Sequence, residues 1–251
     1  MKKAFFRFYA GLNRFFSINK DGKIHTHYFQ GRQSIKDRIE TLGVPHTEVY
    51  LILKRGEAVE FSYLVKDGDR FSIFPGFKDF TLDKEIRLRT PYPGKPKFIA
   101  DTHLGKLARY LRRFGFNTLY ENDYRDKEIV DIALSDNRII LTRDHGLLMR
   151  KRVKYGCFIH YDDPRKQLYS VYGRYDLNKY DHLMGRCVEC NTILEPVAKE
   201  KIIDRLEPKT KKYFHKFYIC QNCNKIYWKG SHYQKTEALI KTIEKNLSGG
   251  N

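Results

Sequence analysis

Two C-x-x-C pairs constrain this sequence more than any other feature. They are Cys187-Val188-Glu189-Cys190 and Cys220-Gln221-Asn222-Cys223. Two such pairs can place four thiolates tetrahedrally around one zinc ion, which would stabilise the fold and take no part in catalysis. Residues 191–219 separate the pairs by more than the usual ribbon spacing, but a hairpin spans that distance. The sequence therefore predicts a Cys₄ zinc ribbon.

The cysteine count also bears on the compartment. Five cysteines are an odd number, and four of them in C-x-x-C pairs favour metal binding in the reducing cytoplasm over disulfides. A redox role for either pair would need a β-α-β context that its surroundings lack. The fifth, Cys157, lies in the apolar stretch YGCFIHY and is expected to be a buried strand thiol.

The charge of the chain favours a polyanionic partner. The formal net charge is +18, with 48 Lys and Arg against 30 Asp and Glu. A basic surface that serves solubility or rests on anionic lipid is the alternative. No apolar run approaches the roughly 18 residues that cross a bilayer. Arg7, Asn13 and Arg14 interrupt the apolar stretch that a secretory signal would need, so we expect a soluble protein.

Residues 1–80 predict a β-rich domain with one helix. Ser34 should begin this helix, with Asp37 as its capping-box partner and Gly43 as its end. Strands are expected at residues 4–9, 23–28, 48–54 and 70–74, and turns at residues 19–22, 55–56 and 66–69. Two strands, a helix and further strands are the order of a β-grasp fold.

The segment EVYLILKRGEAVEFSYLVKDGDRFSIFP resembles the ubiquitin-like sulfur carriers. Those carriers end in a free diglycine, whereas this chain continues beyond Phe77. Gly249 and Gly250 belong to another region and are followed by Asn251. We therefore expect an adaptor or RNA-positioning domain that can also bind a protein partner, with sulfur transfer as the alternative.

After a charged, proline-containing linker at residues 81–97, residues 98–180 alternate between strand and helix patterns. Apolar residues recur at helical spacing, as at Leu104, Leu107 and Leu111. Strands are expected at residues 98–101, 118–120, 138–142 and 157–161, and helices at 104–114, 126–134 and 144–152. The pattern predicts an α/β domain with a parallel sheet of the Rossmann type, which makes the whole chain a combination of α/β and α+β domains.

Three acids fall at or near the carboxyl ends of the expected strands, where parallel sheets bind ligands. These are Asp101, Asp126 and Asp144, with Asp123 and Glu128 nearby. Oxygen ligands suit Mg²⁺ or Mn²⁺, and one or two such ions can activate a water and stabilise the leaving oxygen of a phosphodiester. Each acid taken alone has an ordinary structural interpretation as a helix cap or turn residue.

The stretch from FIADTHLGKLARYLRR to IILTRDHGLLMRK closely resembles the PIN-like nuclease domain known from the C-terminal part of the Mut-seven exonuclease. Asp101 with the following LGKLARYLR helix, Asp126 with Glu128, and the T-R-D motif at residues 142–144 match its landmarks. The resemblance implies a metal-dependent ribonuclease whose acids bind the ions. It also implies that Thr142 orients a water or a carboxylate.

One departure from this family concerns residue 146. Relatives often have a second aspartate two residues after T-R-D, whereas this chain has Gly146. Either Asp123 or Glu128 supplies the missing ligand, or a second ion binds weakly. A non-catalytic RNA-binding adaptor is the rival interpretation, in which the acids hold no ion and a basic ribbon supplies the affinity.

Residues 181–235 resemble the zinc ribbon that accompanies the same nuclease family, including the Tyr-Trp-x-Gly-Ser-His-Tyr ending, and residues 236–251 are expected to be a helix and tail. Between the cysteine pairs, lysines alternate with aromatic residues, most of which we expect in a small core. Candidate RNA contacts combine cations that bind phosphates with side chains that stack on bases. They are Lys106, Arg109, Arg112, Arg113, Arg143, Trp228, His232 and Tyr233. The first four lie on the helix expected at residues 104–114, away from its apolar stripe, and could contact phosphates or form an ordinary solvated face.

Overall fold

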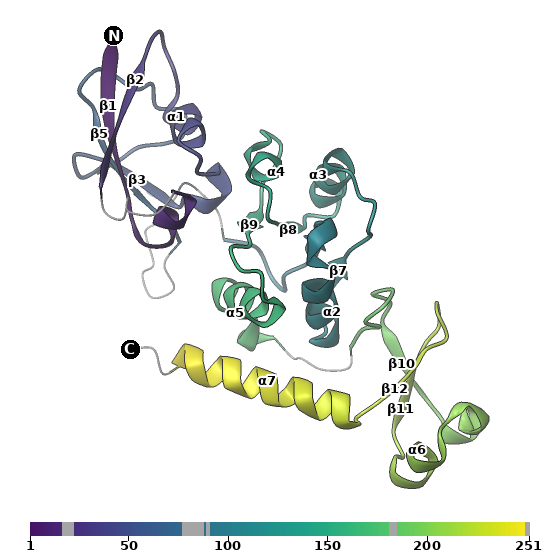
Figure 1. Cartoon of the computed structure of the whole chain (residues 1–251). Helices are drawn as coiled ribbons and strands as arrows, with labels where there is room; N and C mark the ends of the chain where they lie inside the picture. The colour runs from purple at the N-terminus through teal and green to yellow at the C-terminus, as the bar shows by residue number, and fades with distance from the viewer. Residues whose placement is uncertain (17–22, 77–87, 89–90, 181–184, 249–251) are drawn as a thin grey trace. The chain divides into compact units, whose positions relative to one another are not determined.

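The computed structural model describes residues 1–16, 23–76, 88, 91–180 and 185–248 (Figure 1). They fall into two compact units: the first combines residues 1–94 with 125–160, and the second residues 95–124 with 161–251. Three expected features lie at least partly outside the described residues. They are the turn at residues 19–22, the linker at residues 81–97 and the tail that ends in residues 249–251.

A five-stranded sheet with strand order β2-β1-β5-β3-β4 forms the N-terminal domain of the first unit (Figure 1). β1 and β5 pair in parallel, and the other neighbours are antiparallel. Alternation along β1 buries Ala4, Phe6 and Phe8 in the core of this domain. The strands are β1 (Lys2–Phe8), β2 (Ile24–Phe29), β3 (Leu51–Lys54), β4 (Glu57–Ala58) and β5 (Arg70–Phe74). The expected ubiquitin-like β-grasp fold is confirmed.

Helix α1 (Ile35–Thr41) packs on this sheet and begins as the sequence predicts. The Ser34 hydroxyl accepts a hydrogen bond from the Asp37 amide, and the Asp37 carboxylate accepts one from the Ser34 amide. Gly43 follows the helix with φ of +97°, which glycine adopts without strain. Two short 3₁₀ helices, η1 (Ala10–Phe15) and η2 (His46–Glu48), complete the domain.

The rest of the first unit carries half of the expected nuclease domain. β8 and β9 pair in parallel, and every residue of β8 is buried, as in a strand covered on both faces. The N-terminal domain contacts this part directly, since Glu48 Oε1 accepts a 2.8 Å hydrogen bond from the Phe158 amide. The elements are α3 (Asp126–Ser135), β8 (Ile139–Thr142), α4 (His145–Met149) and β9 (Gly156–Phe158).

The second unit begins with the other half of the nuclease elements. β6 and β7 pair in parallel, and Leu107, Ala108 and Leu111 form the buried face of α2. Sequence analysis did not identify α5, although the Asp163 carboxylate accepts two amide hydrogen bonds at its start and proline follows. The elements are β6 (Phe98–Ala100), η4 (Thr102–Leu104), α2 (Gly105–Arg113), β7 (Thr118–Leu119), α5 (Pro164–Arg174) and η5 (Leu177–Lys179).

A three-stranded antiparallel sheet forms the ribbon of the second unit, in the order β10-β11-β12. Phe214 and Trp228 pack on a small core of Ile202, Leu206 and Phe217. Phe214 and Phe217 lie between the cysteine pairs, where core aromatic residues were expected. The elements are β10 (Leu194–Val197), η6 (Lys199–Lys201), η7 (Ile203–Arg205), α6 (Pro208–Tyr213), β11 (Phe217–Cys220), β12 (Ile226–Trp228) and α7 (Ser231–Ser248). Among the described residues, no helix combines the length and apolarity needed to cross a membrane.

Candidate metal centre and nuclease site

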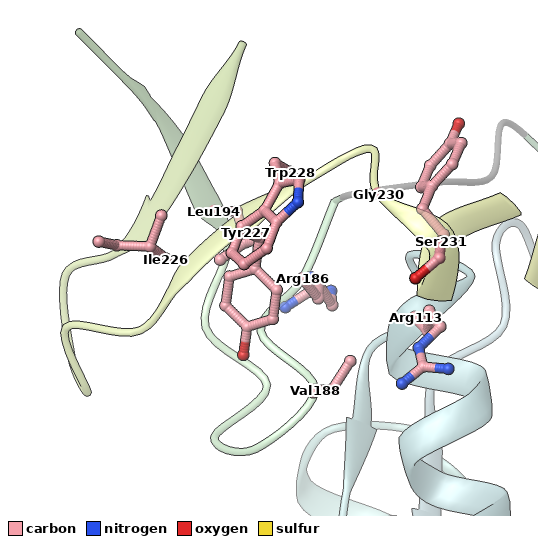
Figure 2. Close-up of a pocket in the computed structure, with 10 residues that line it drawn as sticks. Arg113, Arg186, Val188, Leu194, Ile226, Tyr227, Trp228, Gly230 and Ser231 are labelled. Atoms are coloured by element: carbon pink, nitrogen blue, oxygen red, sulfur yellow. The ribbon is translucent and has the colours of Figure 1, made fainter. Parts of the chain in front are cut away.

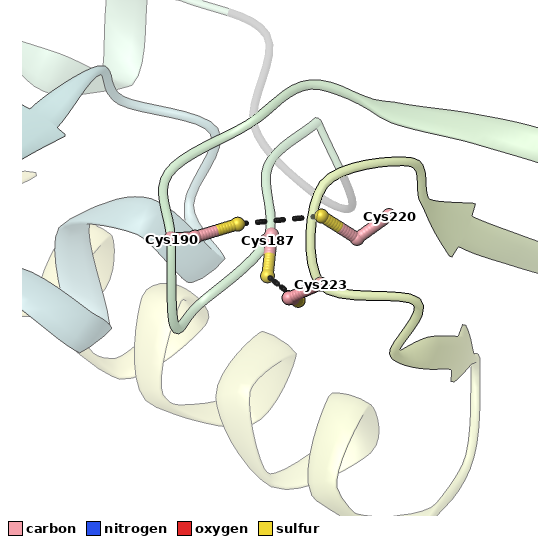
Figure 3. Close-up of side chains that lie close together, drawn as sticks. All are labelled: Cys187, Cys190, Cys220 and Cys223. Carbon is pink, nitrogen blue, oxygen red and sulfur yellow. Dashed lines mark hydrogen bonds between the residues drawn. The ribbon is translucent and has the colours of Figure 1, made fainter.

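The four cysteines of the C-x-x-C pairs meet at one point of the ribbon (Figure 3). Their sulfur atoms all lie within 4.8 Å of one another, with 3.5 Å between Cys187 and Cys223 and 3.3 Å between Cys190 and Cys220. Tetrahedral zinc with bonds of 2.3 Å sets neighbouring sulfurs about 3.8 Å apart. The cluster can therefore hold a metal ion such as zinc.

Each cysteine pair is folded into a tight loop by its own backbone. The Asn191 amide donates to the Cys187 carbonyl at 3.0 Å, and the Asn224 amide donates to the Cys220 carbonyl at 2.8 Å. Both asparagines have positive φ, 66° and 56°, a conformation that asparagine tolerates better than most residues. The asparagine after each C-x-x-C pair is thus part of the turn that points both sulfurs inward.

Tyr227 of β12 supports the cluster from outside. Its hydroxyl lies 3.0 Å from the Cys187 sulfur. Burial and this contact raise the pKa of Tyr227 above its ordinary value, so the phenol keeps its proton and donates to the sulfur. Such donors orient and stabilise metal-binding thiolates.

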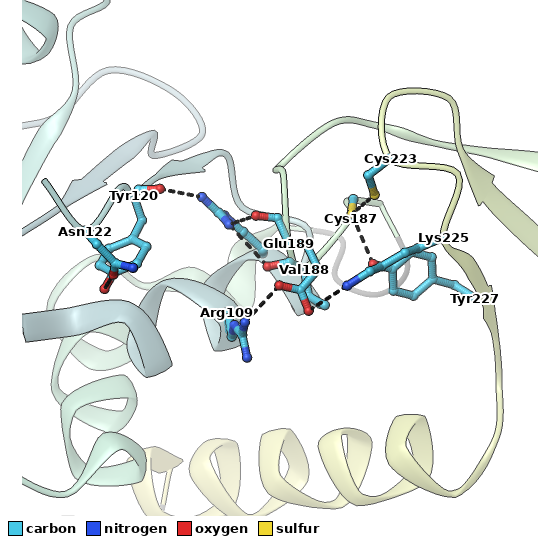
Figure 4. A network of polar contacts seen from close by, with 10 residues as sticks. Arg109, Tyr120, Asn122, Cys187, Val188, Glu189, Cys223, Lys225 and Tyr227 are labelled. Carbon is cyan, nitrogen blue, oxygen red and sulfur yellow. Dashed lines mark hydrogen bonds and ion pairs between the residues drawn. The ribbon is translucent and has the colours of Figure 1, made fainter. Parts of the chain in front are cut away.

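Arg112 of α2 holds the first cysteine loop against the helix, in the network that Figure 4 shows. Its guanidinium donates to the carbonyls of Val188, Glu189 and Thr118, the last at 2.8 Å. Burial lowers the pKa of Arg112, but a guanidinium stays protonated in proteins, and the carbonyl oxygens compensate its charge.

This position corrects one expectation. Arg112 was predicted on the exposed face of its helix as a phosphate contact, but it is only 4% exposed and its donors bind backbone oxygens. Lys106 and Arg109 are exposed as expected, and Arg109 forms a 2.8 Å ion pair with Glu189. Arg113 is half-buried and donates to the Thr236 hydroxyl at 3.2 Å.

Asp101 follows β6 directly, in the second unit. Its Oδ1 accepts a 2.7 Å hydrogen bond from the Thr102 amide and so caps η4. The carboxylate is half-buried. Asp126 and Asp144 lie in the first unit. The convergence of Asp101 with them stays a prediction.

Asp144 is an exposed residue held by its neighbours after β8. Its Oδ1 accepts a 2.7 Å hydrogen bond from the Gly146 amide, and its own amide donates to the buried Thr142 hydroxyl at 2.9 Å. Thr142 therefore orients the residue that carries the carboxylate. A Cβ at residue 146 would lie 3.2 Å from Asp144 Oδ1, so glycine gives this carboxylate room.

Asp126 begins α3 and is paired with a cation. Arg150, which follows α4, approaches Asp126 Oδ2 to 2.7 Å. Glu128 caps the same helix, since its Oε2 accepts from the Arg125 amide at 2.9 Å. Asp123 is exposed in the preceding turn. The structure thus gives Asp101, Asp126 and Asp144 structural partners. Asp144 caps a helix, as its ordinary interpretation expected, but the same interpretation is wrong for Asp126, because Arg125 is the N-cap of α3 and Asp126 pairs with Arg150.

Across the part of the chain that the structure describes, the four cysteines are the group whose ligand atoms lie close enough together to hold a metal ion. Of the other expected RNA contacts, Arg143 is exposed, Trp228 and Tyr233 are half-buried, and the His232 side chain lies outside the described residues. Arg165 and Arg186 line cavities beside these residues but were not identified from the sequence. The start of α5, marked by Asp163 and Pro164, would have pointed to Arg165.

Comparisons with known families agree with this architecture. Residues 96–240 match the family described as Mut7-C RNAse domain, and residues 1–81 match the family described as Mut7-C ubiquitin. No curated protein and no solved structure matches the chain. The first match covers more than half of the 251 residues. The chain therefore belongs to the Mut7-C RNAse domain family and carries a Mut7-C ubiquitin-like domain at its N-terminal end.

Proposed function

We propose that the chain cleaves RNA by metal-dependent hydrolysis, with Asp101, Asp126 and Asp144 holding Mg²⁺ or Mn²⁺. The observation that carries the proposal is the match of residues 96–240 to the Mut7-C RNAse domain family. The donor set consists of carboxylates, which fit these hard cations. Such ions would activate a water and stabilise the leaving oxygen of the phosphodiester.

The residues around the acids support this role. Thr142 and Gly146 fix Asp144 through two hydrogen bonds, and the cap uses only Oδ1, which leaves Oδ2 as a ligand atom. Asp126 would exchange the exposed guanidinium of Arg150 for an ion. Asp123 and Glu128 remain candidates for a further ligand, and Arg143 for a phosphate contact.

A non-catalytic RNA-binding adaptor is the second candidate function. The observation in its favour is that each main acid already has a structural partner: Asp101 and Asp144 cap helices, and Asp126 pairs with Arg150. The positive net charge of +18 would then supply RNA affinity alone.

Cleavage of labelled RNA in the presence of Mn²⁺ distinguishes the two functions. Asp101→Asn and Asp144→Asn should abolish metal-dependent cleavage but barely change the melting temperature, because asparagine caps helices as well as aspartate. Asp37→Asn, in the capping box of α1, is the matched control and should cleave normally. Tight, salt-sensitive RNA binding without cleavage by the unmodified chain would favour the adaptor.

We also propose that the cysteine cluster binds one structural Zn²⁺ and that the N-terminal domain binds a protein partner. The four-thiol donor set supports zinc, and metal analysis of the purified chain tests its stoichiometry. The ubiquitin-like fold supports the partner role. A candidate partner protein should co-purify with the full chain but not with a chain that lacks residues 1–81, and this comparison tests that role.

A further inference from the structure

A cavity of about 330 Å³ lies beside the cysteine cluster (Figure 2). Arg186 and Val188 line it from the first cysteine loop, Tyr227 and Trp228 from β12, and Tyr233 from the first turn of α7. Its volume falls at the lower end of the range for small-ligand sites, about 300 to 1,000 Å³. The cavity therefore has room for a flat group such as a nucleobase.

Three aromatic side chains, Tyr227, Trp228 and Tyr233, line this cavity together with aliphatic ones, and we call it the aromatic pocket. Gly230 leaves room for Trp228, because a Cβ at residue 230 would lie 2.6 Å from the indole nitrogen. The Tyr233 amide donates to the Gly230 carbonyl at 3.0 Å, which turns the chain into α7. The Tyr-Trp-x-Gly-Ser-His-Tyr motif thus builds one side of the pocket.

The charged groups of the aromatic pocket are all cations. Arg113 and Arg186 line it, and none of its ten lining residues is acidic. Lys229 lies with its ammonium 5.2 Å from the centre of the Tyr233 ring. An occupant that combines an aromatic ring with negative charge therefore matches the pocket.

A second groove, of about 350 Å³, runs along α2 and the start of α5. Lys106, Arg109, Arg113 and Arg165 line it, and we call it the basic groove. Asp163 is the acidic residue of its lining and is bound to the amides at the start of α5. Since Arg113 lines both cavities, the basic groove and the aromatic pocket adjoin.

We propose that the aromatic pocket binds one unpaired base of single-stranded RNA and that the basic groove binds the adjoining phosphates. The proposal rests on the proposed function in taking RNA as the polyanion. Base stacking on aromatic rings, combined with a cationic groove that follows the backbone, is the usual chemistry of single-strand recognition. An acidic peptide would engage the arginines but leave the rings unused.

The single tryptophan of the chain reports on this pocket directly. The full-length, zinc-loaded protein is titrated with a short single-stranded oligoadenylate, without Mg²⁺ or Mn²⁺. Stacking on Trp228 should quench its fluorescence. An abasic strand of equal charge and a polyglutamate peptide should not. Equal quenching by either of them would overturn the proposal.

Substitutions then test the pocket residues by polarisation of labelled RNA. Trp228→Leu and Tyr233→Leu should each weaken binding by about fivefold or more, the lower range for loss of one stacked base. Arg186→Gln removes a cation of the pocket and should also weaken binding. Tyr213→Leu, at a 64% exposed tyrosine of α6, and Arg32→Gln, in the N-terminal domain, should bind normally. Zinc content and melting temperature identify variants that fail to fold. Tyr233→Phe and Trp228→Phe keep an aromatic ring at each position and should retain binding.

These outcomes separate the pocket from the nuclease proposal. If RNA is cleaved and the pocket variants bind and cleave it normally, the pocket proposal fails and the nuclease stands. If RNA is bound through the pocket but Mn²⁺ produces no cleavage, the nuclease proposal fails and the pocket stands.

Discussion

The hydroxyl of Tyr227 lies 3.0 Å from the sulfur of Cys187, and it joins the cysteine cluster to the wall of the aromatic pocket. The same tyrosine thus contacts a sulfur of the proposed zinc site at its hydroxyl and lines a cavity with its ring. Loss of the metal should consequently change the pocket as well as the ribbon.

Tyr227→Phe should weaken metal retention without unfolding the ribbon. The phenylalanine keeps the ring but removes the donor to Cys187, and loss of such supporting hydrogen bonds lowers metal affinity about 10- to 100-fold. The measurement is zinc release to a competing chelator. Tyr218→Phe, at the residue directly opposite Tyr227 on β11, is the control and should release zinc as the unmodified chain does.

Arg112→Lys should destabilise the second unit. One ammonium cannot replace the fork of donors that reaches the carbonyls of Thr118, Val188 and Glu189. We expect a loss of about 2 to 4 kcal/mol in the free energy of unfolding by denaturant, because buried carbonyls lose charged donors. Arg109→Gln removes only an exposed ion pair on the same helix. This substitution should change the free energy of unfolding by less than about 1 kcal/mol.

The contrast between Arg112 and Arg109 shows where the sequence stops being informative. Helical spacing identified α2 and its apolar residues Leu107 and Leu111, because local periodicity follows burial. It placed Arg112 on the solvent side, since an arginine is rarely buried. Besides the nearby Thr118 carbonyl, the carbonyls of Val188 and Glu189 accept from Arg112, and this cysteine loop is distant in the chain.

Local rules predicted the parts of the fold that local interactions determine. Ser34 and Asp37 begin α1, and the cysteine spacing placed the four sulfurs together. The contact of Glu48 with the Phe158 amide has no local signal, because it joins residues 110 positions apart. The pocket around Trp228 needed the arrangement of three segments, of which the sequence indicated only the aromatic motif.

Acidification should weaken the N-terminal domain through His27. Burial lowers the pKa of His27, as does the neighbouring Arg38, whose guanidinium lies 2.7 Å from His27 Nε2. Neutral Nε2 accepts from Arg38, and a protonated ring cannot. Because the folded pKa lies below the unfolded value of about 6.5, this stabilisation is full above that pH and falls as pH drops below it.

Protonation of one group can change the free energy of unfolding by no more than about 1.4 kcal/mol per pH unit, which sets the largest slope expected from His27. Denaturant unfolding between neutral pH and pH 5 measures it, and amide exchange in β1 and β2 reports the local effect. His27→Gln keeps an acceptor for Arg38 and should reduce the slope. An unchanged slope in this variant would assign the acid sensitivity to another group.

Arg150→Gln should lower the Mn²⁺ concentration that half-saturates RNA cleavage. Arg150 and Asp126 pair at 2.7 Å with side chains 46% and 42% exposed, so solvent screens the pair to less than about 1 kcal/mol. Removal of this cation frees the carboxylate for an ion, and that energy limits the gain to about fivefold. Arg152→Gln is the matched control, because Arg152 forms a similar 2.6 Å pair with Asp131, which is not among the proposed ligands. A higher Mn²⁺ requirement in Arg150→Gln would contradict competition between the guanidinium and the ion. Equal effects of both substitutions would show a general charge effect. That second result would remove Asp126 from the proposed ligands.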